Sequence, residues 1–511
     1  MRVLNRLFIG TALGLIATQS FALTGEVVWA NQTAYLAPMG ITVSQTQTRD
    51  GNVLTVSDIS YDVVFPFGVG SMSVKSSPQT YTENADGTVN VGYSAANALA
   101  ISATFRPDDQ TEINLSANLD VVLTGNTTVA SGTADDVTYV TSSDLLEVTL
   151  SDLTISGAPD VQDLAVDFYL SAADTTATVQ ITTGANTTIH STSRTGVTIA
   201  DYGVSYTDEF SSKTVSRQSG LEATYALTLP AGPMDLMNIS QALRDGLTLQ
   251  AEVKTGESQS QAVTSSFGAM VSNQSTTVAS ATTVGRFDAA GFGFSGGAMG
   301  FDVSVPLMQG LPFPVDLSGG SVDYNFAFPI NASDQPADMR YAISISDIVV
   351  NEDVWALLDP TAALPRDPMS IKIDVTAAVK LLVDLLDIPS MTQTIEASAM
   401  PFDFQSVTIN DLSASGLGAS AAASGEFTLD MTDLFTFDGF PRPTGQATAT
   451  MTGVNGLLDK LTGMGLLTAD DAMAGRLMIG MFARVVGEDQ LQSTLEINAQ
   501  GHVIANGQRI Q

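Results

Sequence analysis

Residues 343–348 read Ile-Ser-Ile-Ser-Asp-Ile, and residues 407–412 read Val-Thr-Ile-Asn-Asp-Leu. Similar strings occur at residues 54–59, 148–153 and, in a weaker form, 197–202. In the four stronger strings apolar residues alternate with polar ones before the Asp, and the alternation resumes after it with its phase moved by one residue. Alternation of this kind predicts β-strands with one apolar face, so these strings determine the expected fold.

A phase shift of one residue would turn every later apolar side chain to the opposite face of a regular strand. A β-bulge inserts one residue and restores the face, and Asp suits a bulge because its carboxylate bonds nearby backbone N–H groups. We therefore expect sheet bends at Asp58, Asp152, Asp201, Asp347 and Asp411. A calcium site at these positions is the weaker interpretation, because each is a lone acid among apolar neighbours.

The apolar residues beside the four stronger bends are predicted to line one continuous face of the sheet. They are Val56, Ile59, Leu150, Leu153, Ile345, Ile348, Ile409 and Leu412. The spacing between the bends has no common period, which argues against a solenoid with a fixed repeat. The expected fold is mainly β, with long, curled, bulged antiparallel sheet(s) and a few short packing helices, mostly in the C-terminal third.

Helices are predicted where apolar residues recur at helical spacing. Two such stretches are residues 374–386 and residues 457–486, and the second is interrupted before Thr468, which can act as an N-cap. Residues 234–243 are a weaker candidate. We expect these helices to pack on the sheet.

The first 22 residues have the features of an export signal. Arg2 and Arg6 form a positive segment, residues 7–17 are apolar, and Ser20-Phe21-Ala22 supplies the small residues that signal peptidase requires. The apolar segment is too short to anchor the chain in a bilayer. We expect cleavage after Ala22, a periplasmic location in a Gram-negative bacterium and no transmembrane anchor afterwards, with an uncleaved N-terminal anchor as the alternative.

The mature chain is expected to contain an N-terminal β-rich region over residues 23–290 and a C-terminal β-rich region with the helices over residues 291–511. Lys and Arg total 20 against 54 Asp and Glu, and removal of Arg2 and Arg6 with the signal makes the net charge −36. This charge repels nucleic acid, so no nucleic-acid partner is expected. The absence of Cys excludes disulfides and thiol catalysis.

No segment carries a catalytic signature. His190 and His502 are the two histidines, and no Gly-x-Ser-x-Gly string is present to supply a nucleophile. Residues 291–296 match the letters of a dinucleotide-binding turn, but no amphipathic helix follows them. We therefore expect a protein that is not an enzyme, with no cofactor and no metal ligands.

Two motifs resemble a known family. Residues 355–368 read Trp-Ala-Leu-Leu-Asp-Pro-Thr-Ala-Ala-Leu-Pro-Arg-Asp-Pro, and residues 495–508 read Leu-Glu-Ile-Asn-Ala-Gln-Gly-His-Val-Ile-Ala-Asn-Gly-Gln. They resemble the exported Gram-negative proteins of the domain of unknown function 2125 family, and we expect the likeness to cover most of the mature chain. The family has no established activity, so the resemblance implies no site residues. The β-rich proteins of this family also resemble envelope proteins with long curled sheets, and some of those envelope proteins carry lipid. This second likeness is an analogy of fold alone.

Two functional hypotheses remain. In the first, the sheet of an envelope protein holds a lipid or another apolar chain in a groove along the predicted face. In the second, the sheet closes over its own core and the protein is a structural or interaction scaffold for an envelope partner. An outer-membrane β-barrel and a hydrolase rank below both, because aromatic residues are only 7% of the chain and no catalytic signature is present.

Overall fold

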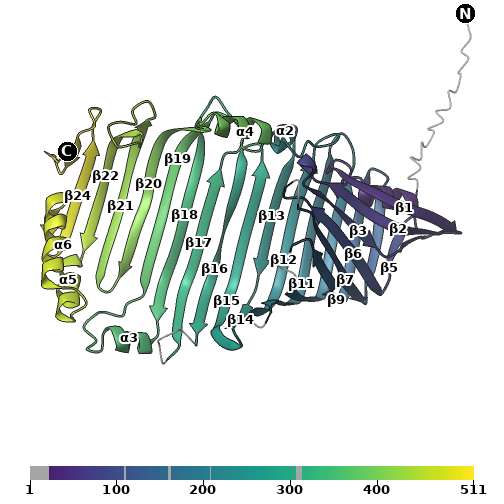
Figure 1. Ribbon diagram of the computed structural model, residues 1–511, viewed down its shortest axis with the longest axis horizontal. Helices are drawn as coiled ribbons and strands as arrows, with labels where there is room; N and C mark the ends of the chain where they lie inside the picture. The colour runs from purple at the N-terminus through teal and green to yellow at the C-terminus, as the bar shows by residue number, and fades with distance from the viewer. Residues whose placement is uncertain (1–21, 109–110, 159–162, 208, 307–312, 511) are drawn as a thin grey trace, which may run out of the picture.

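The chain folds into one long sheet with a rolled N-terminal end (Figure 1). The computed structural model describes residues 22–108, 111–158, 163–207, 209–306 and 313–510. In this part of the chain the sheet has 26 strands, and its strand pairings are antiparallel. The prediction of a mainly β fold with a long antiparallel sheet is confirmed.

From the ninth strand onward, strands that follow one another in the chain mostly pair with each other. These strands are β9 (Asp136–Ser156), β10 (Leu164–Thr182), β11 (Thr187–Tyr206), β12 (Phe210–Leu229), β13 (Thr248–Thr255), β14 (Ser258–Ser266), β15 (Ala269–Asp288), β16 (Gly291–Val305), β17 (Val315–Phe328), β18 (Ala337–Val350), β19 (Met369–Leu381), β20 (Phe402–Gly416), β21 (Ala419–Asp430), β22 (Arg442–Thr452), β23 (Arg484–Gly487), β24 (Gln490–Ile497), β25 (Val503–Ala505) and β26 (Gln508–Arg509). The expected boundary between residues 290 and 291 is the turn between β15 and β16, which pair along their length.

The N-terminal strands form the rolled end. They are β1 (Ile41–Asp50), β2 (Val53–Val64), β3 (Gly70–Ser76), β4 (Gln79–Glu83), β5 (Val89–Tyr93), β6 (Ala96–Phe105), β7 (Ile113–Thr124) and β8 (Thr127–Thr133). Between β2 and β9 the sheet divides into two lanes, β3–β6–β7 and β4–β5–β8. In Figure 1 these strands lie in front of the strands that follow β9, so the sheet doubles back on itself.

A short helix fills the inside of the roll. The helix is α1 (Gly25–Thr33), and its Val28 and Trp29 are buried against strands from both walls, including Tyr81 of β4 and Tyr139 of β9. The Asn31 side-chain amide donates to the backbone carbonyl of Ile181 in β10 (3.2 Å). The main hydrophobic core therefore lies at the rolled end, where α1 joins the two walls.

The other α-helices lie at the rims and at the C-terminal end (Figure 1). They are α2 (Ile239–Arg244), α3 (Glu352–Leu358), α4 (Ile388–Glu396), α5 (Val454–Gly463) and α6 (Ala469–Phe482). The predicted stretch 457–486 corresponds to α5 and α6, followed by β23, and the Thr468 hydroxyl accepts the Asp471 N–H as an N-cap. The candidate at 234–243 is helical only from Ile239.

The predicted helix over residues 374–386 is wrong, because most of this stretch belongs to strand β19. Its apolar residues fit both periods, since Val375, Ala377, Val379 and Leu381 also alternate. Pairing with β18 and β20 buries three of these four side chains, which an isolated helical stripe would not achieve. Tertiary pairing therefore decides between two patterns that the local sequence leaves equal.

Three of the repeated Asp residues have left-handed backbone conformations inside strands. The φ angles are 52° at Asp58, 52° at Asp152 and 56° at Asp347. Beside each of them the pairing with a neighbouring strand shifts by one residue, so that two residues face a single partner. Asp adopts this conformation more readily than most residues because its short carboxylate bonds locally.

Asp411 and Asp201 differ from these three. The pairing of β20 with both of its neighbours shifts at Asn410 and Asp411. Asp201, in contrast, pairs in continuous register with Tyr169 on one side and Val215 on the other, so the bend predicted there is wrong. The apolar residues that follow Asp201 are largely exposed, and no buried face has to be restored at this point.

The left-handed conformation at Asp347 generates a testable prediction. A Val at this position has a branched Cβ that resists a positive φ, whereas Gly adopts it freely. We expect Asp347→Val to lower the free energy of unfolding by about 1–2 kcal/mol, and Asp347→Gly to leave it nearly unchanged. Equilibrium denaturation in urea measures both, and equal losses in the two variants would contradict this account.

Candidate functional site

One side of the sheet carries an unbroken row of paired apolar residues. Directly opposed residues in antiparallel strands point to the same side of a sheet. From β9 to β17 the row is Val137, Ile181, Ile189, Leu227, Leu249, Phe287, Phe292 and Phe328. A second row continues from β16 to β20 through Phe294, Phe326, Tyr341, Val375 and Ile409. We call the side with these two rows the apolar face.

The other side of the same strands is polar. The row one residue away runs Thr138, Gln180, His190, Ala226, Gln250, Arg286, Gly293, Ala327, Arg340, Thr376 and Thr408. Ion pairs also lie on this side, including Arg340 with Asp374 (2.8 Å). Along these rows the sheet is therefore amphipathic from β9 to β20.

The apolar face is closed at one end and open in the middle. Val137, Ile181 and Ile189 are buried in the rolled end. In the centre Phe294 is 38% exposed and Tyr341 is 45% exposed. Rings on β16, β17 and β18 stack into an aromatic band, which consists of Phe292, Phe294, Tyr324, Phe326 and Tyr341, with centroids 5.1 to 6.5 Å apart.

The eight residues predicted to line one apolar face lie in two environments, the buried core of the rolled end and the half-buried surface of the sheet. Val56 and Ile59 are buried in the core of the rolled end. The other six are half-buried in the sheet. Ile345 pairs with Val322 and Ile371, and Leu412 lies one row away opposite Ile373, so the pairs on β18 and β20 belong to the apolar face.

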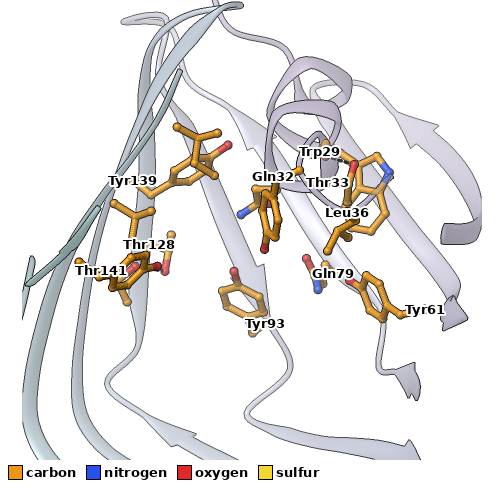
Figure 2. A pocket seen from close by; sticks show the side chains of 14 residues that line it. Trp29, Gln32, Thr33, Leu36, Tyr61, Gln79, Tyr93, Thr128, Tyr139 and Thr141 are labelled. Carbon is orange, nitrogen blue, oxygen red and sulfur yellow. Dashed lines mark hydrogen bonds between the residues drawn. The ribbon is translucent and has the colours of Figure 1, made fainter. Parts of the chain in front are cut away.

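A cavity of about 390 Å³ lies where the apolar face enters the rolled end (Figure 2). Trp29 and Gln32 of α1 line one side, and residues of β2, β4, β5, β8, β9, β10 and β12 line the rest. Five of the eleven tyrosines of the chain meet here, namely Tyr35, Tyr61, Tyr93, Tyr139 and Tyr225. None of them was predicted as a site residue, because the roll alone brings together positions that are up to 190 residues apart.

The cavity is polar but uncharged. Its lining residues include Gln32, Gln79 and three threonines, and none of them is Asp, Glu, Lys, Arg or His. The Tyr81 hydroxyl lies 2.8 Å from the side-chain amide oxygens of both glutamines. Burial raises the pKa of the Tyr35 and Tyr93 hydroxyls above the usual tyrosine range, so these groups stay neutral donors.

The two histidines and the segment that resembles a dinucleotide-binding turn lie in separate parts of the fold. His190 is exposed on the polar side of β11, and His502 lies in the hairpin between β24 and β25. Residues 291–296 lie within strand β16 and form no turn before a helix. Within the part of the chain that the structure describes, no group of His, Asp and Glu is arranged to hold a metal ion, and no helix is long and apolar enough to cross a membrane.

The C-terminal part of the sheet matches the model of a known protein family. The model of the family described as "Uncharacterized protein conserved in bacteria (DUF2125)" matches residues 325–507. The chain contains a DUF2125 domain. The matched residues cover the first motif and all but the last residue of the second, but they do not extend over most of the mature chain as expected. No curated protein and no solved structure matches the chain.

The first DUF2125 motif is a loop folded around one buried carboxylate. Asp359 accepts hydrogen bonds from the backbone N–H groups of Ala363 (2.9 Å) and Leu364 (2.8 Å). Burial alone would raise the pKa of Asp359, but these N–H donors outweigh it and hold the pKa below its usual range. The Arg366 guanidinium lies 5.3 Å from the centre of the Trp355 ring, which fastens the loop to α3.

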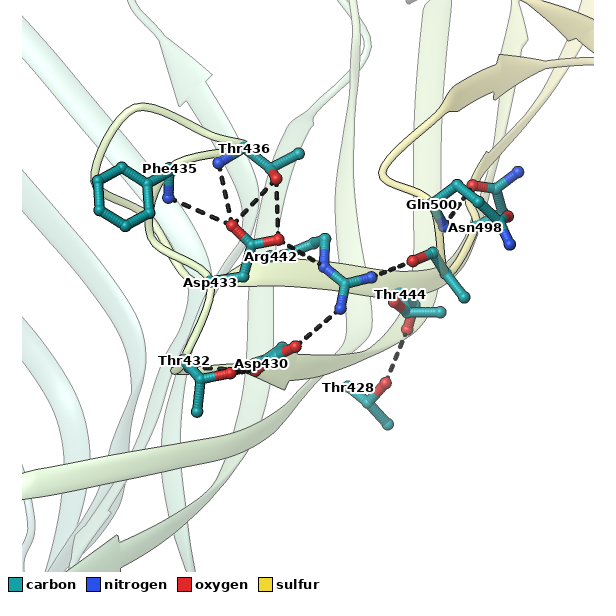
Figure 3. A network of polar contacts seen from close by, with 11 residues as sticks. Thr428, Asp430, Thr432, Asp433, Phe435, Thr436, Arg442, Thr444, Asn498 and Gln500 are labelled. Atoms are coloured by element: carbon teal, nitrogen blue, oxygen red, sulfur yellow. Dashed lines mark hydrogen bonds and ion pairs between the residues drawn. The ribbon is translucent and has the colours of Figure 1, made fainter.

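The second motif is fastened by a charged network at the opposite rim (Figure 3). Arg442 pairs with Asp430 (2.7 Å) and Asp433 (2.9 Å) and donates a hydrogen bond to the Ala499 carbonyl in the β24–β25 turn. The Asp433 carboxylate also accepts the N–H of Phe435, whose side chain is 92% exposed. Both DUF2125 motifs thus stabilise the rims, and neither contributes a residue to the two apolar rows.

The buried carboxylate gives a pH prediction. Since the folded pKa of Asp359 lies below the unfolded value of about 3.9, its contribution to stability is complete above that pH and is lost as the pH falls through the folded pKa. We expect Asp359→Asn to lower the Tm by a few degrees at pH 7 and to narrow the difference from wild type below pH 4. Thermal unfolding between pH 3 and 7 measures this, with Asp367→Asn, an exposed change in the same loop, as the control.

Proposed function

We propose that this chain is an exported, non-enzymatic protein of the bacterial periplasm that holds the acyl chains of a lipid against its apolar face. The observation that carries the proposal is the pair of apolar rows, which runs from the buried roll to an aromatic band whose rings remain partly open to water. Leaving such a continuous surface in water is unfavourable, and exposed apolar patches of this kind mark binding surfaces.

The chemistry of the apolar face favours a lipid over a protein partner. Protein interfaces contain about one hydrogen bond per 100–200 Å² and are enriched in Arg. The two rows carry one hydroxyl, that of Tyr341, and no charged group. Acyl chains need no polar partners, and from β13 to β20 the paired strands give them a surface about 30 Å wide at the usual spacing between strands.

The scaffold hypothesis is favoured by a different observation. At the rolled end the sheet does close over its own core, and α1 fills the interior. The two hypotheses therefore make opposite predictions for the open part of the apolar face, which starts near Leu249.

A charge placed on the apolar face tests lipid binding. Mature protein purified from the periplasm is examined by native mass spectrometry with lipid extraction, and wild type is expected to carry bound lipid. Phe326→Glu puts a carboxylate in the aromatic band, and the cost of removing it from water should lower lipid occupancy by at least about tenfold. Asn325→Glu adds the same charge on the polar side of the same strand and should leave occupancy unchanged.

A lipid-free wild type that also takes up no lipid on incubation would support the scaffold instead. Equal losses in the two variants would show that the charge acts through folding and not through the apolar face.

The export part of the proposal has its own test. Residues 1–21 lie outside the described residues, but Leu23 is buried and its N–H donates to the Gly87 carbonyl (3.3 Å), while Ala22 is exposed. A free amino group at Leu23 keeps this donor, so cleavage after Ala22 is compatible with the fold. N-terminal sequencing of the native protein should therefore begin at Leu23, and an intact Met1 would contradict export by a cleaved signal.

A further inference from the structure

We infer that the tyrosine-lined cavity at the rolled end binds an uncharged, hydroxyl-bearing head group, so that the preferred ligand is a neutral glycolipid. This inference rests on the proposed function and adds the class of lipid to it. The cavity and the apolar face share Tyr225, which lines the cavity, is 40% exposed and leads through its paired partners Ala251 and Gly285 to Phe294 of the aromatic band. An amphiphile can therefore place its head in the cavity and its chains along the open part of the apolar face.

The lining of the cavity excludes a charged head group on energetic grounds. None of the lining side chains is ionisable near neutral pH, so a phosphate would lose its water without gaining a counter-charge. Arg49 of β1 is already paired with Glu26 in the first turn of α1 (2.6 Å) and with Glu83 (2.7 Å). The large negative charge of the chain adds a further penalty for an anion.

The same lining suits a sugar. Trp29 and the tyrosines present flat apolar rings, while Gln32 and Gln79 present amides, and this combination contacts the C–H faces and the hydroxyl groups of a saccharide. Among the described residues, the hydroxyls of Tyr35 and Tyr225 have no hydrogen-bond partner within the protein. Both hydroxyls are therefore free to bond a ligand. The aromatic band on β16 to β18, in contrast, is dominated by Phe rings and suits chains.

The test compares two lipids with identical acyl chains, monogalactosyl diacylglycerol and phosphatidylglycerol, on the mature full-length protein by native mass spectrometry. We expect the galactolipid to bind at least about tenfold more tightly, because only the phosphate loses its water uncompensated. The double variant Tyr35→Phe with Tyr225→Phe should weaken galactolipid binding by about tenfold and leave phosphatidylglycerol unchanged. The control is Tyr202→Phe, which removes a hydroxyl from an exposed tyrosine that does not line the cavity.

The outcomes distinguish a failure of the head-group assignment from a failure of the proposed function. Equal binding of the two lipids, lost in Phe326→Glu, would overturn the head-group assignment and leave lipid binding standing. Binding of neither lipid would overturn both. Methyl galactoside, the head group without chains, distinguishes the source: if it binds as tightly as the galactolipid, the cavity serves free saccharides and the glycolipid assignment is wrong.

Discussion

The register between neighbouring strands is the constraint on which the rest of this structure depends. Because facing residues share a side, a chain of pairings carries the apolar character from Val137 in β9 to Ile409 in β20. A slip of one residue in the pairing of any strand would turn the apolar side chains of that strand to the polar side of the sheet. The bulges at Asp58, Asp152 and Asp347 are consistent with this constraint, since each shifts the pairing where the sequence shifts its phase.

The strand pattern and the bulges could be predicted from the sequence because both depend on local alternation. The phase shift at 343–348 is visible in six residues, and so is the Asp that takes a left-handed conformation there. The failures occur where local information is ambiguous. Residues 374–386 satisfy both the helical and the strand period, and Asp174 is left-handed at φ 53° although no repeated string surrounds it. Only the neighbouring strands decide such cases.

The cavity could not be predicted for a different reason. Its tyrosines lie on five strands or segments, and no interval between them is regular. They meet because the two lanes of short strands carry the sheet around α1, a geometry that arises from many pairings together. The DUF2125 motifs were visible in sequence because each is a compact loop or hairpin, but they stabilise the rims, so recognising them did not reveal the site.

The position of α1 has a consequence for how the molecule assembles. Most of the sheet pairs strands that are adjacent in the chain, and such hairpins form by closing short loops. The contact between Asn31 and Ile181 joins residues 150 positions apart, so it closes a far larger loop and carries a greater entropic cost. The strands from β9 onward can therefore pair as successive local hairpins, whereas the roll is completed only after β10 has formed. Because α1 precedes all of its partner strands in the chain, its Trp29 has no buried site until β9 and β10 have formed.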